Sequence, residues 1–381
     1  MSNRAQRETL RARPSGLAEK ISDRPLQSAL VALVGGLVTL GCAPVDAQQE
    51  SATFAEPIST ADAAQASYQR ILDAALNLMD TLSPAQREAL VLDYNFANAT
   101  RWHTYPDATL GRRRNRLGLQ LDGLSEEQWN AVYALLDAAL GSAPNEGADE
   151  VRQHLSVDDY LRRGGTRRDY GRGEFKLAFL GMPSPTGLWE LQFGGHHLAV
   201  ANTYRDGLLI GATPSFRGME PLTPIDHDGR SIAPQLQEHE AFVAVLASLT
   251  DDQLRRARLP RRGTLMMARR NWDFPERPQG LPVAELNQEQ RALVVAAMAT
   301  FVGDADDVTA AAFMDKYRNE FDQTYLGFSG SPALSNTGDY VRIDGPSVWI
   351  ELDMDPPFST HQPHPHALWR DKQADYGGNR R

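Results

Sequence analysis

Cysteine is almost absent from this sequence: Cys42 is the single one among 381 residues. A disulfide framework and a cysteine-based metal site each need several cysteines, so neither can stabilise the fold. Any metal site must therefore use histidine and carboxylate ligands, and stability must come from a packed core. Hydrophobic residues make up 41% and charged residues 23% of the chain, which argues against wholesale disorder.

Basic residues are also in deficit. The 39 Lys and Arg residues are outnumbered by 49 Asp and Glu residues, which gives a formal net charge of −10. Binding to nucleic acid needs clustered cations, so we expect no nucleic acid partner. The local basic run of Arg112, Arg113 and Arg114 with Arg116 is typical of a solvent-exposed loop.

The apolar run at 29–40 is too short to span a bilayer, but it suits the centre of a secretory signal. Basic residues are frequent before it, as such signals require. Cleavage after Ala47 would remove residues 1–47 and leave 48–60 as a flexible leader. Lipidation of Cys42 is the alternative. Both predict export to the periplasm or the exterior, with no transmembrane span in the mature chain.

Several common enzyme motifs are missing. No GxGxxG, GxxxxGK[ST] or GxSxG pattern occurs in its required context, which excludes dinucleotide, P-loop and nucleophile-elbow sites. The segment 237–240 is not an HExxH arrangement, so a zincin-type metalloprotease is not predicted either.

An internal repeat organises the chain. Four cap-type residues are each followed three positions later by Gln, which predicts helices that begin with a capping box: Ser83, Ser125, Thr250 and Asn287. Trp-containing strands around Trp189 and Trp349 come later in each half. We therefore predict two related halves, 61–235 and 236–381, packed together as one globular unit.

Each half reads as helices followed by antiparallel strands, which predicts an α+β fold. Apolar spacing predicts the helices and alternation predicts the strands. The expected helices are 61–80, 84–97, 126–140, 238–249, 288–301 and 308–321. The expected strands are 174–180, 188–193, 197–204, 208–213, 339–343, 347–353 and 366–370. We further expect the histidine-bearing strands of the two halves to approach one another.

The sharpest local signal is His364-Pro365-His366. Side chains at i and i+2 of a strand point to the same side, and Pro365 disfavours a helix before it. Two imidazoles on one face are a common way to bind Zn, Fe, Cu or Mn. The alternative is a polar C-terminal tail.

A second signal is Gly194-Gly195-His196-His197. Neighbouring strand residues face opposite ways, so one of His196 and His197 should join the metal site, and the sequence does not say which. Taken alone, either imidazole could be a buried residue bonded to the backbone.

Further candidates surround these histidines. Glu238 and Glu240 are candidate general bases, and His103 is a candidate proton-transfer residue. Arg370 could bind an anionic substrate group or form a structural ion pair with a nearby aspartate, and Trp102 could form a pocket wall. Each of these residues could equally be structural.

Together these motifs resemble domain of unknown function family 3500. The likeness rests on WELQFGGHHLAV, TPSFRGMEPL and HPHALWRD, and it extends from about residue 65 to the end. The resemblance implies that His196, His197, His366, Arg370 and Asp371 occupy characteristic positions of the family. It implies no activity.

The function predicted from these residues is an extracytoplasmic, metal-dependent hydrolase with a histidine-rich divalent metal site, and Zn is the first choice of metal. Its expected partner is a small-molecule substrate, for which an anionic group at Arg370 is one option. Two alternatives stay open. One is an Fe or Cu oxidoreductase that uses the same ligands. The other is a protein that binds a small molecule or a metal without turnover.

Overall fold

A computed structural model describes residues 60–109, 116–163, 169–267 and 271–378. These residues belong to one compact unit, Pro57–Arg381. The predicted signal at 1–47, the leader up to residue 59 and the basic run Arg112–Arg114 lie outside the described residues. Within the described ranges, no helix combines the length and apolar character that crossing a membrane would need.

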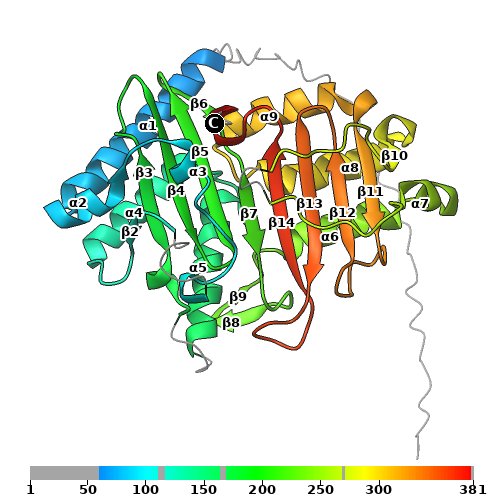
Figure 1. Cartoon of the computed structure of the whole chain (residues 1–381), viewed down its shortest axis with the longest axis horizontal. Helices are drawn as coiled ribbons and strands as arrows, with labels where there is room; N and C mark the ends of the chain where they lie inside the picture. Colours follow the sequence, from blue (N-terminus) through cyan, green and yellow to red (C-terminus); the bar gives the residue numbers. More distant parts are fainter. Residues whose placement is uncertain (1–59, 110–115, 164–168, 268–270, 379–381) are drawn as a thin grey trace, which may run out of the picture. The chain divides into compact units, whose positions relative to one another are not determined.

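One large mixed sheet forms the centre of the fold. In the described ranges it has the strand order β1-β3-β4-β5-β7-β14-β13-β12-β11-β10, with β2 beside β3 and β6 beside β5. Figure 1 shows β7 and β14 side by side in the middle, where they join the strands of the two halves. The strands are β1 (Val91–Leu92), β2 (Leu119–Gln120), β3 (Lys176–Leu180), β4 (Leu188–Gly195), β5 (Leu198–Arg205), β6 (Leu208–Gly211), β7 (Ser215–Gly218), β10 (Leu281–Pro282), β11 (Tyr325–Ser329), β12 (Tyr340–Asp344), β13 (Val348–Asp355) and β14 (His364–Asp371). A separate hairpin pairs β8 (Ile225–His227) with β9 (Arg230–Ile232).

Helices account for most of the remaining described chain, which confirms the α+β class. The α-helices are α1 (Thr60–Thr81), α2 (Pro84–Leu90), α3 (Phe96–Ala99), α4 (Glu126–Ala139), α5 (Gly147–Arg163), α6 (Leu236–Ala247), α7 (Asp251–Ala257), α8 (Gln288–Val302) and α9 (Asp307–Asn319). Short 3-10 helices are η1 (Asp107–Thr109), η2 (Arg172–Glu174), η3 (Val283–Glu285), η4 (Phe321–Gln323) and η5 (Asp375–Gly378).

All four predicted capping boxes form, at the starts of α2, α4, α7 and α8. The cap glutamines also bond in pairs. Gln128 donates to the side chain of Gln86, and Gln290 donates to that of Gln253. Each box therefore satisfies the exposed amides of its own helix and ties that helix to a neighbour.

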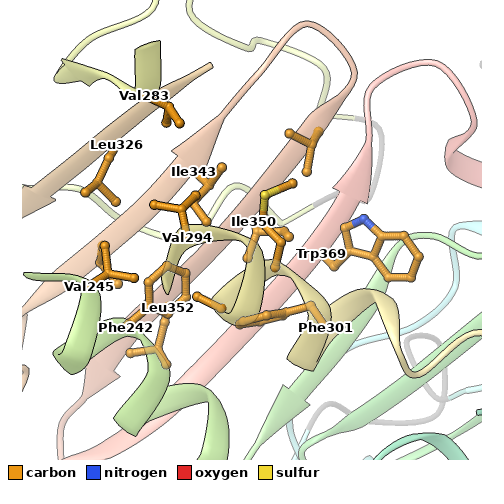
Figure 2. Close-up of a cluster of buried hydrophobic side chains, with 14 of the residues drawn as sticks. Phe242, Val245, Val283, Val294, Phe301, Leu326, Ile343, Ile350, Leu352 and Trp369 are labelled. Atoms are coloured by element: carbon orange, nitrogen blue, oxygen red, sulfur yellow. The ribbon is translucent and has the colours of Figure 1, made fainter. Parts of the chain in front are cut away.

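The two faces of the sheet differ in chemistry. Alternate residues of the strands face the helices and form two apolar cores, one of which is shown in Figure 2 with Phe242 and Phe301 packed over Ile350 and Leu352. The opposite face carries His366 and other polar and aromatic side chains. Two cover segments lie over it: the first is residues 93–107, and the second is the described residues 259–267 and 271–280. Ala99 accepts a hydrogen bond from Gln192, and the amide of Met266 donates to Glu351.

Some predicted boundaries are wrong. The helix expected at 84–97 ends at Leu90, because Val91 is extended and pairs in parallel with Phe179 of β3. The strand expected from residue 197 begins at Leu198, since His196 and His197 form the turn between β4 and β5. Helix α5, strand β7 and the β8–β9 hairpin were not predicted.

Candidate metal centre

Three buried imidazoles converge at the join between β5, β7 and β14. Among the described residues, His197, His364 and His366 form a group that could hold a metal ion, with one ligand atom of each lying within 4.8 Å of the others. The Nε2 atom of His366 lies 3.1 Å from Nε2 of His197 and 3.2 Å from Nε2 of His364. His364 and His366 share one face of β14, as their spacing predicts.

The spacing between these nitrogens suits a single cation. Zinc binds imidazole nitrogen at about 2.0–2.1 Å, so two ligands of a tetrahedral ion lie about 3.3 Å apart and two at a right angle about 2.9 Å apart. The contacts of 3.1 and 3.2 Å fall between these values. In the His triad, meaning His197, His364 and His366, the two contacts of His366 therefore have a spacing compatible with one divalent metal ion.

The His triad is also in the protonation state that metals require. Burial, followed by the neighbouring imidazoles, holds the pKa of His197 and of His366 well below the usual histidine range. Burial lowers the pKa of His364 to about 4, although the carboxylate of Glu220 opposes this shift. Neutral imidazoles are metal ligands, whereas imidazolium ions are not.

Asp355 orients the imidazole ring of His366. Its Oδ2 atom lies 3.2 Å from Nδ1 of His366. A carboxylate at this position favours a proton on Nδ1, which leaves the Nε2 lone pair directed at the other two imidazoles. Nδ1 of His364 has no hydrogen-bond partner among the described residues. Glu220 instead holds the chain segment that precedes His364. Its Oε1 atom accepts hydrogen bonds from the backbone amides of Phe358, Ser359 and Thr360.

Backbone conformation places His197. It occupies the second position of the β4–β5 turn with φ of 58°, a region that histidine rarely adopts. Such a conformation costs about 1–3 kcal/mol and is typical of functional positions. Strand alternation therefore does not decide which of the two adjacent histidines joins the centre; the turn does.

Gly218 of β7 makes room for the rings. A Cβ atom added at this position would lie 2.9 Å from Cδ2 of His366 and 3.2 Å from Cγ of His197. Its amide also donates to the carbonyl of His197 over 2.8 Å. Sequence reasoning missed Gly218, because a glycine in a short extended segment gives no sign of which rings it admits.

His196 lies beside the His triad and outside it. Its ring stacks on that of His197 with centroids 3.8 Å apart, and its Nδ1 atom lies 2.8 Å from Oδ1 of Asp158. Asp158 belongs to α5 and is held by the amide of Gly171. Tyr170 packs edge-on against the same imidazole. The site thus combines three convergent imidazoles with a fourth that is paired to a carboxylate.

The His triad borders a cavity through His366. A cavity of about 390 Å³ lies under the cover segments and is lined by His366, Asp353 and Asp355 of the sheet, with Tyr105 and Arg262 from the two segments. This volume lies in the usual range for small-molecule pockets, about 300–1,000 Å³.

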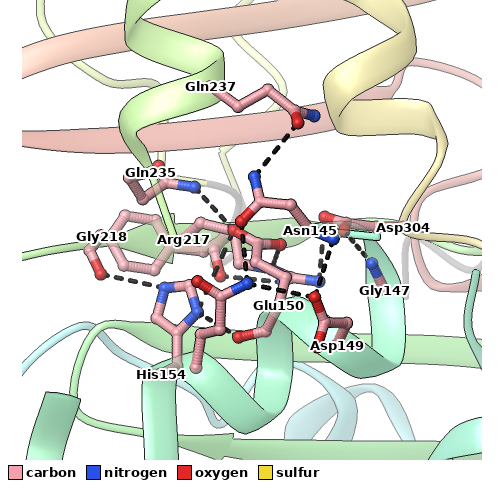
Figure 3. Close-up of polar contacts among 12 residues, drawn as sticks. Asn145, Gly147, Asp149, Glu150, His154, Arg217, Gly218, Gln235, Gln237 and Asp304 are labelled. Carbon is pink, nitrogen blue, oxygen red and sulfur yellow. Dashed lines mark hydrogen bonds and ion pairs between the residues drawn. The ribbon is translucent and has the colours of Figure 1, made fainter. Parts of the chain in front are cut away.

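The predicted glutamates lie elsewhere. Glu240 is exposed and lines a different hollow, next to Gln237. Glu238 is buried, and burial followed by Glu150 raises its pKa well above the usual range. It belongs to a buried acidic cluster around Arg217. Figure 3 shows Arg217 beside Glu150 and Asp304. The Nε atom of Arg217 lies 2.9 Å from Oε2 of Glu150. Neither glutamate is in the group of ligands formed by the His triad.

The remaining candidates are buried in structural contacts. Arg370 is fully buried and forms an ion pair with Asp375 at 2.7 Å, which corresponds to the structural alternative. Trp102 donates its indole N–H to Tyr376. His103 lies 3.0 Å from Asp107, and the same aspartate pairs with the buried Arg116. Arg116 also donates to the carbonyls of His103 and Gly195, so it ties the first cover segment to the histidine-bearing turn.

Comparison with known proteins gives one match. The sequence model of a family described as "Protein of unknown function (DUF3500)" matches residues 64–378. No curated protein and no solved structure matches the chain. The matched range contains the His triad, His196 and both cover segments, and it confirms the family resemblance expected from the histidine motifs.

Proposed function

The chain belongs to the DUF3500 family, and from the geometry of its own side chains we propose that it is a metal-dependent hydrolase. The observation that carries this proposal is the convergence of three neutral Nε2 atoms at 3.1 and 3.2 Å, beside a cavity of about 390 Å³. Three protein ligands leave a coordination position open, which is the arrangement of catalytic rather than structural zinc sites.

Zinc is the proposed metal, and iron, copper and manganese are the alternatives. A bound divalent ion lowers the pKa of a coordinated water toward neutrality. The all-imidazole ligand set suits zinc, iron and copper better than magnesium or calcium, which prefer oxygen ligands. Which of zinc, iron and copper binds depends on metal availability as well as on ligand geometry.

His196 takes the general-base role that was expected of Glu238 or Glu240. Its ring lies against His197, and the Asp158 contact at Nδ1 fixes the imidazole tautomer. Nε2 then carries the lone pair, so His196 would serve as a proton acceptor, and in its protonated form as a donor, for a reaction at the His triad. Asp158 acts here as a positioning residue for His196.

We further propose that the two halves arose by duplication. The cap-to-cap hydrogen bonds recur in both, Gln86 with Gln128 and Gln253 with Gln290. Gly118 and Gly280 also match: both have positive φ and face a strand carbonyl so closely that neither tolerates a Cβ atom. The strands of Trp189 and Trp349 are not equivalent in this comparison, because β4 adjoins β3 whereas β12 separates β13 from β11.

We propose an extracytoplasmic location for the same protein. The support is the apolar run at 29–40 with basic residues before it and a small-residue pattern ending at Ala47. N-terminal sequencing of the mature protein tests this: a start at Gln48 supports cleavage, a blocked and lipidated Cys42 supports the anchored form, and an intact Met1 contradicts export.

The proposed activity is tested with chromogenic esters, amides, phosphoesters and glycosides. Hydrolysis should need added zinc, stop with a chelator and be lost in His366→Ala. His361→Ala is the matched control, since His361 is exposed and lies in the same segment without joining the ligand group. Hydrolysis that survives both chelation and His366→Ala would contradict the proposal. Metal-dependent oxygen consumption without hydrolysis would favour the oxidoreductase, and stable metal binding without turnover would favour the binding protein.

A further inference from the structure

The cavity beside His366 has a chemical character that defines its ligand. We propose that it binds a neutral, hydroxyl-rich molecule such as a sugar or polyol, and this inference rests on the proposed metal-dependent function. The cavity is bounded by the second half of β13, by His366 and by residues of both cover segments.

Asp353 provides the first contact point. It lines the cavity and is only 6% exposed, and its Oδ1 atom has no hydrogen-bond partner among the described residues. A buried carboxylate oxygen without a partner is costly, and a bound donor group would remove that cost. The ligand should therefore present a hydrogen-bond donor at Asp353.

Asp355 extends the acceptor surface toward the metal centre. It follows Asp353 by two positions on the same strand face, and its Oδ2 atom contacts His366. Its side chain remains 34% exposed, so it can accept a second hydrogen bond from the ligand. The two carboxylates, Asp353 and Asp355, can therefore accept hydrogen bonds from adjacent hydroxyl groups of one molecule.

Arg262 limits the charge of the ligand. Arg262 lines the same cavity as Asp353 and Asp355, so its guanidinium belongs to the same ligand-facing surface as the two carboxylates. An organic cation would meet this guanidinium, and an anion would meet two carboxylates. A hydroxyl group donates to the carboxylates and accepts from Arg262 without either penalty.

The rim supplies the remaining features of a hydroxyl-rich ligand site. Tyr105 lines the cavity and is 49% exposed, so it adds aromatic surface against which the apolar side of a sugar ring can pack. Leu265 and Met267 form an apolar wall, while Thr104 and Thr264 add hydroxyl groups. The cavity thus alternates polar contact points with apolar surface, as small-molecule sites do. Bound there, a ligand lies next to His366.

Isothermal titration of the zinc-loaded full chain tests the proposal with three probes: monosaccharides and sorbitol, 1,4-diaminobutane, and succinate. The sugars or the polyol should bind best, and Asp353→Asn should weaken that binding at least tenfold. Arg262→Gln, at an exposed position, should weaken it as well and guards against a folding defect in the first variant. Asp226→Asn, at an exposed site in another hollow, is the control and should bind as the wild type does.

Preferential binding of the diamine or of succinate would overturn the proposal, as would binding that both variants leave unchanged or the absence of binding by every probe. Zinc content is measured in the same samples. Stoichiometric zinc without sugar or polyol binding defeats the ligand assignment and leaves the hydrolase proposal standing. Sugar binding in a chain that takes up no metal defeats the hydrolase proposal alone.

Discussion

The Nε2 atoms of His197 and His366 lie 3.1 Å apart, although 169 positions separate the two residues in the chain. β7 makes this approach possible, because it pairs with β5 on one side and with β14 on the other. The contact therefore exists only in the folded sheet. A metal bound there would stabilise the folded state over the unfolded one by mass action, which amounts to about 2.7 kcal/mol at a free metal concentration of 100 times Kd.

Asp355→Asn should weaken metal binding while leaving the fold intact. The carboxylate contacts Nδ1 of His366, and loss of such a partner typically costs about 10–100-fold in metal affinity. Competition with a chromogenic zinc chelator measures the change. Asp322→Asn, on η4 at an exposed position, is the control. An affinity equal to that of the wild type would show that Asp355 does not orient the ligand.

Gly218→Ala should disturb the centre by steric means alone. The added Cβ would approach Cδ2 of His366 to 2.9 Å and must displace one of the rings. We expect at least a tenfold loss of zinc affinity together with a destabilisation of about 1–3 kcal/mol from overpacking. Gly229→Ala, which has open space around it, separates the two effects: it should lose some stability through its positive φ but keep its zinc affinity. Unchanged affinity in Gly218→Ala would contradict the tight approach of the rings.

Arg370→Ala should lower the free energy of unfolding without altering the metal content of the protein. Arg370 is fully buried, and its removal leaves Asp375 as a buried charge without its partner. Breaking such a pair costs about 3–5 kcal/mol, measurable as a lower denaturant midpoint. Arg255→Ala breaks an exposed pair with Asp252 and should cost about 1 kcal/mol or less. A normal midpoint with lost substrate turnover would instead make Arg370 a substrate ligand.

Glu190 should give the protein a measurable pH dependence. Burial raises its pKa to about 7, above the ordinary value of 4.5. Between these two values the folded state keeps a proton that the unfolded state has lost, so stability falls as pH rises through this window. Glu190→Gln cannot lose a proton and should gain stability relative to the wild type between pH 5 and pH 8, by up to roughly 3 kcal/mol.

Chemical denaturation at several pH values measures this difference. Glu240→Gln is the matched control, because Glu240 is exposed, and it should follow the wild-type pH profile. A Glu190→Gln variant whose stability runs parallel to that of the wild type from pH 5 to pH 8 would show that Glu190 is already ionised at pH 5.

Local signals in the sequence predicted local structure well. The four capping boxes involve side chains and amides only three positions apart, so residues such as Ser83 and Gln86 determine them without help from the rest of the fold. The same holds for His364 and His366, whose shared strand face follows from their spacing. The α+β class could likewise be read from the order of apolar patterns.

Tertiary features escaped prediction for identifiable reasons. Helix α5 buries Glu150, His154 and Asp158, so its inward face has the polar residues normally seen on an outward one, and its pattern does not indicate a helix. Asp158, which pairs with His196, lies on this helix and was missed for the same reason. The orientation of His197 depends on a turn with positive φ rather than on strand alternation, and the burial of Arg370 depends on the second cover segment.

The central claim, that the His triad binds one divalent metal, is tested most directly by elemental analysis of the purified protein after equilibration with zinc and removal of the free ion. The account predicts close to one zinc per chain in the wild type and in His361→Ala, and almost none in His364→Ala with His366→Ala. The melting temperature should rise with zinc only in the first two proteins. A wild-type chain that retains no zinc, copper, iron or manganese, or a double variant that retains as much as the wild type, would contradict it.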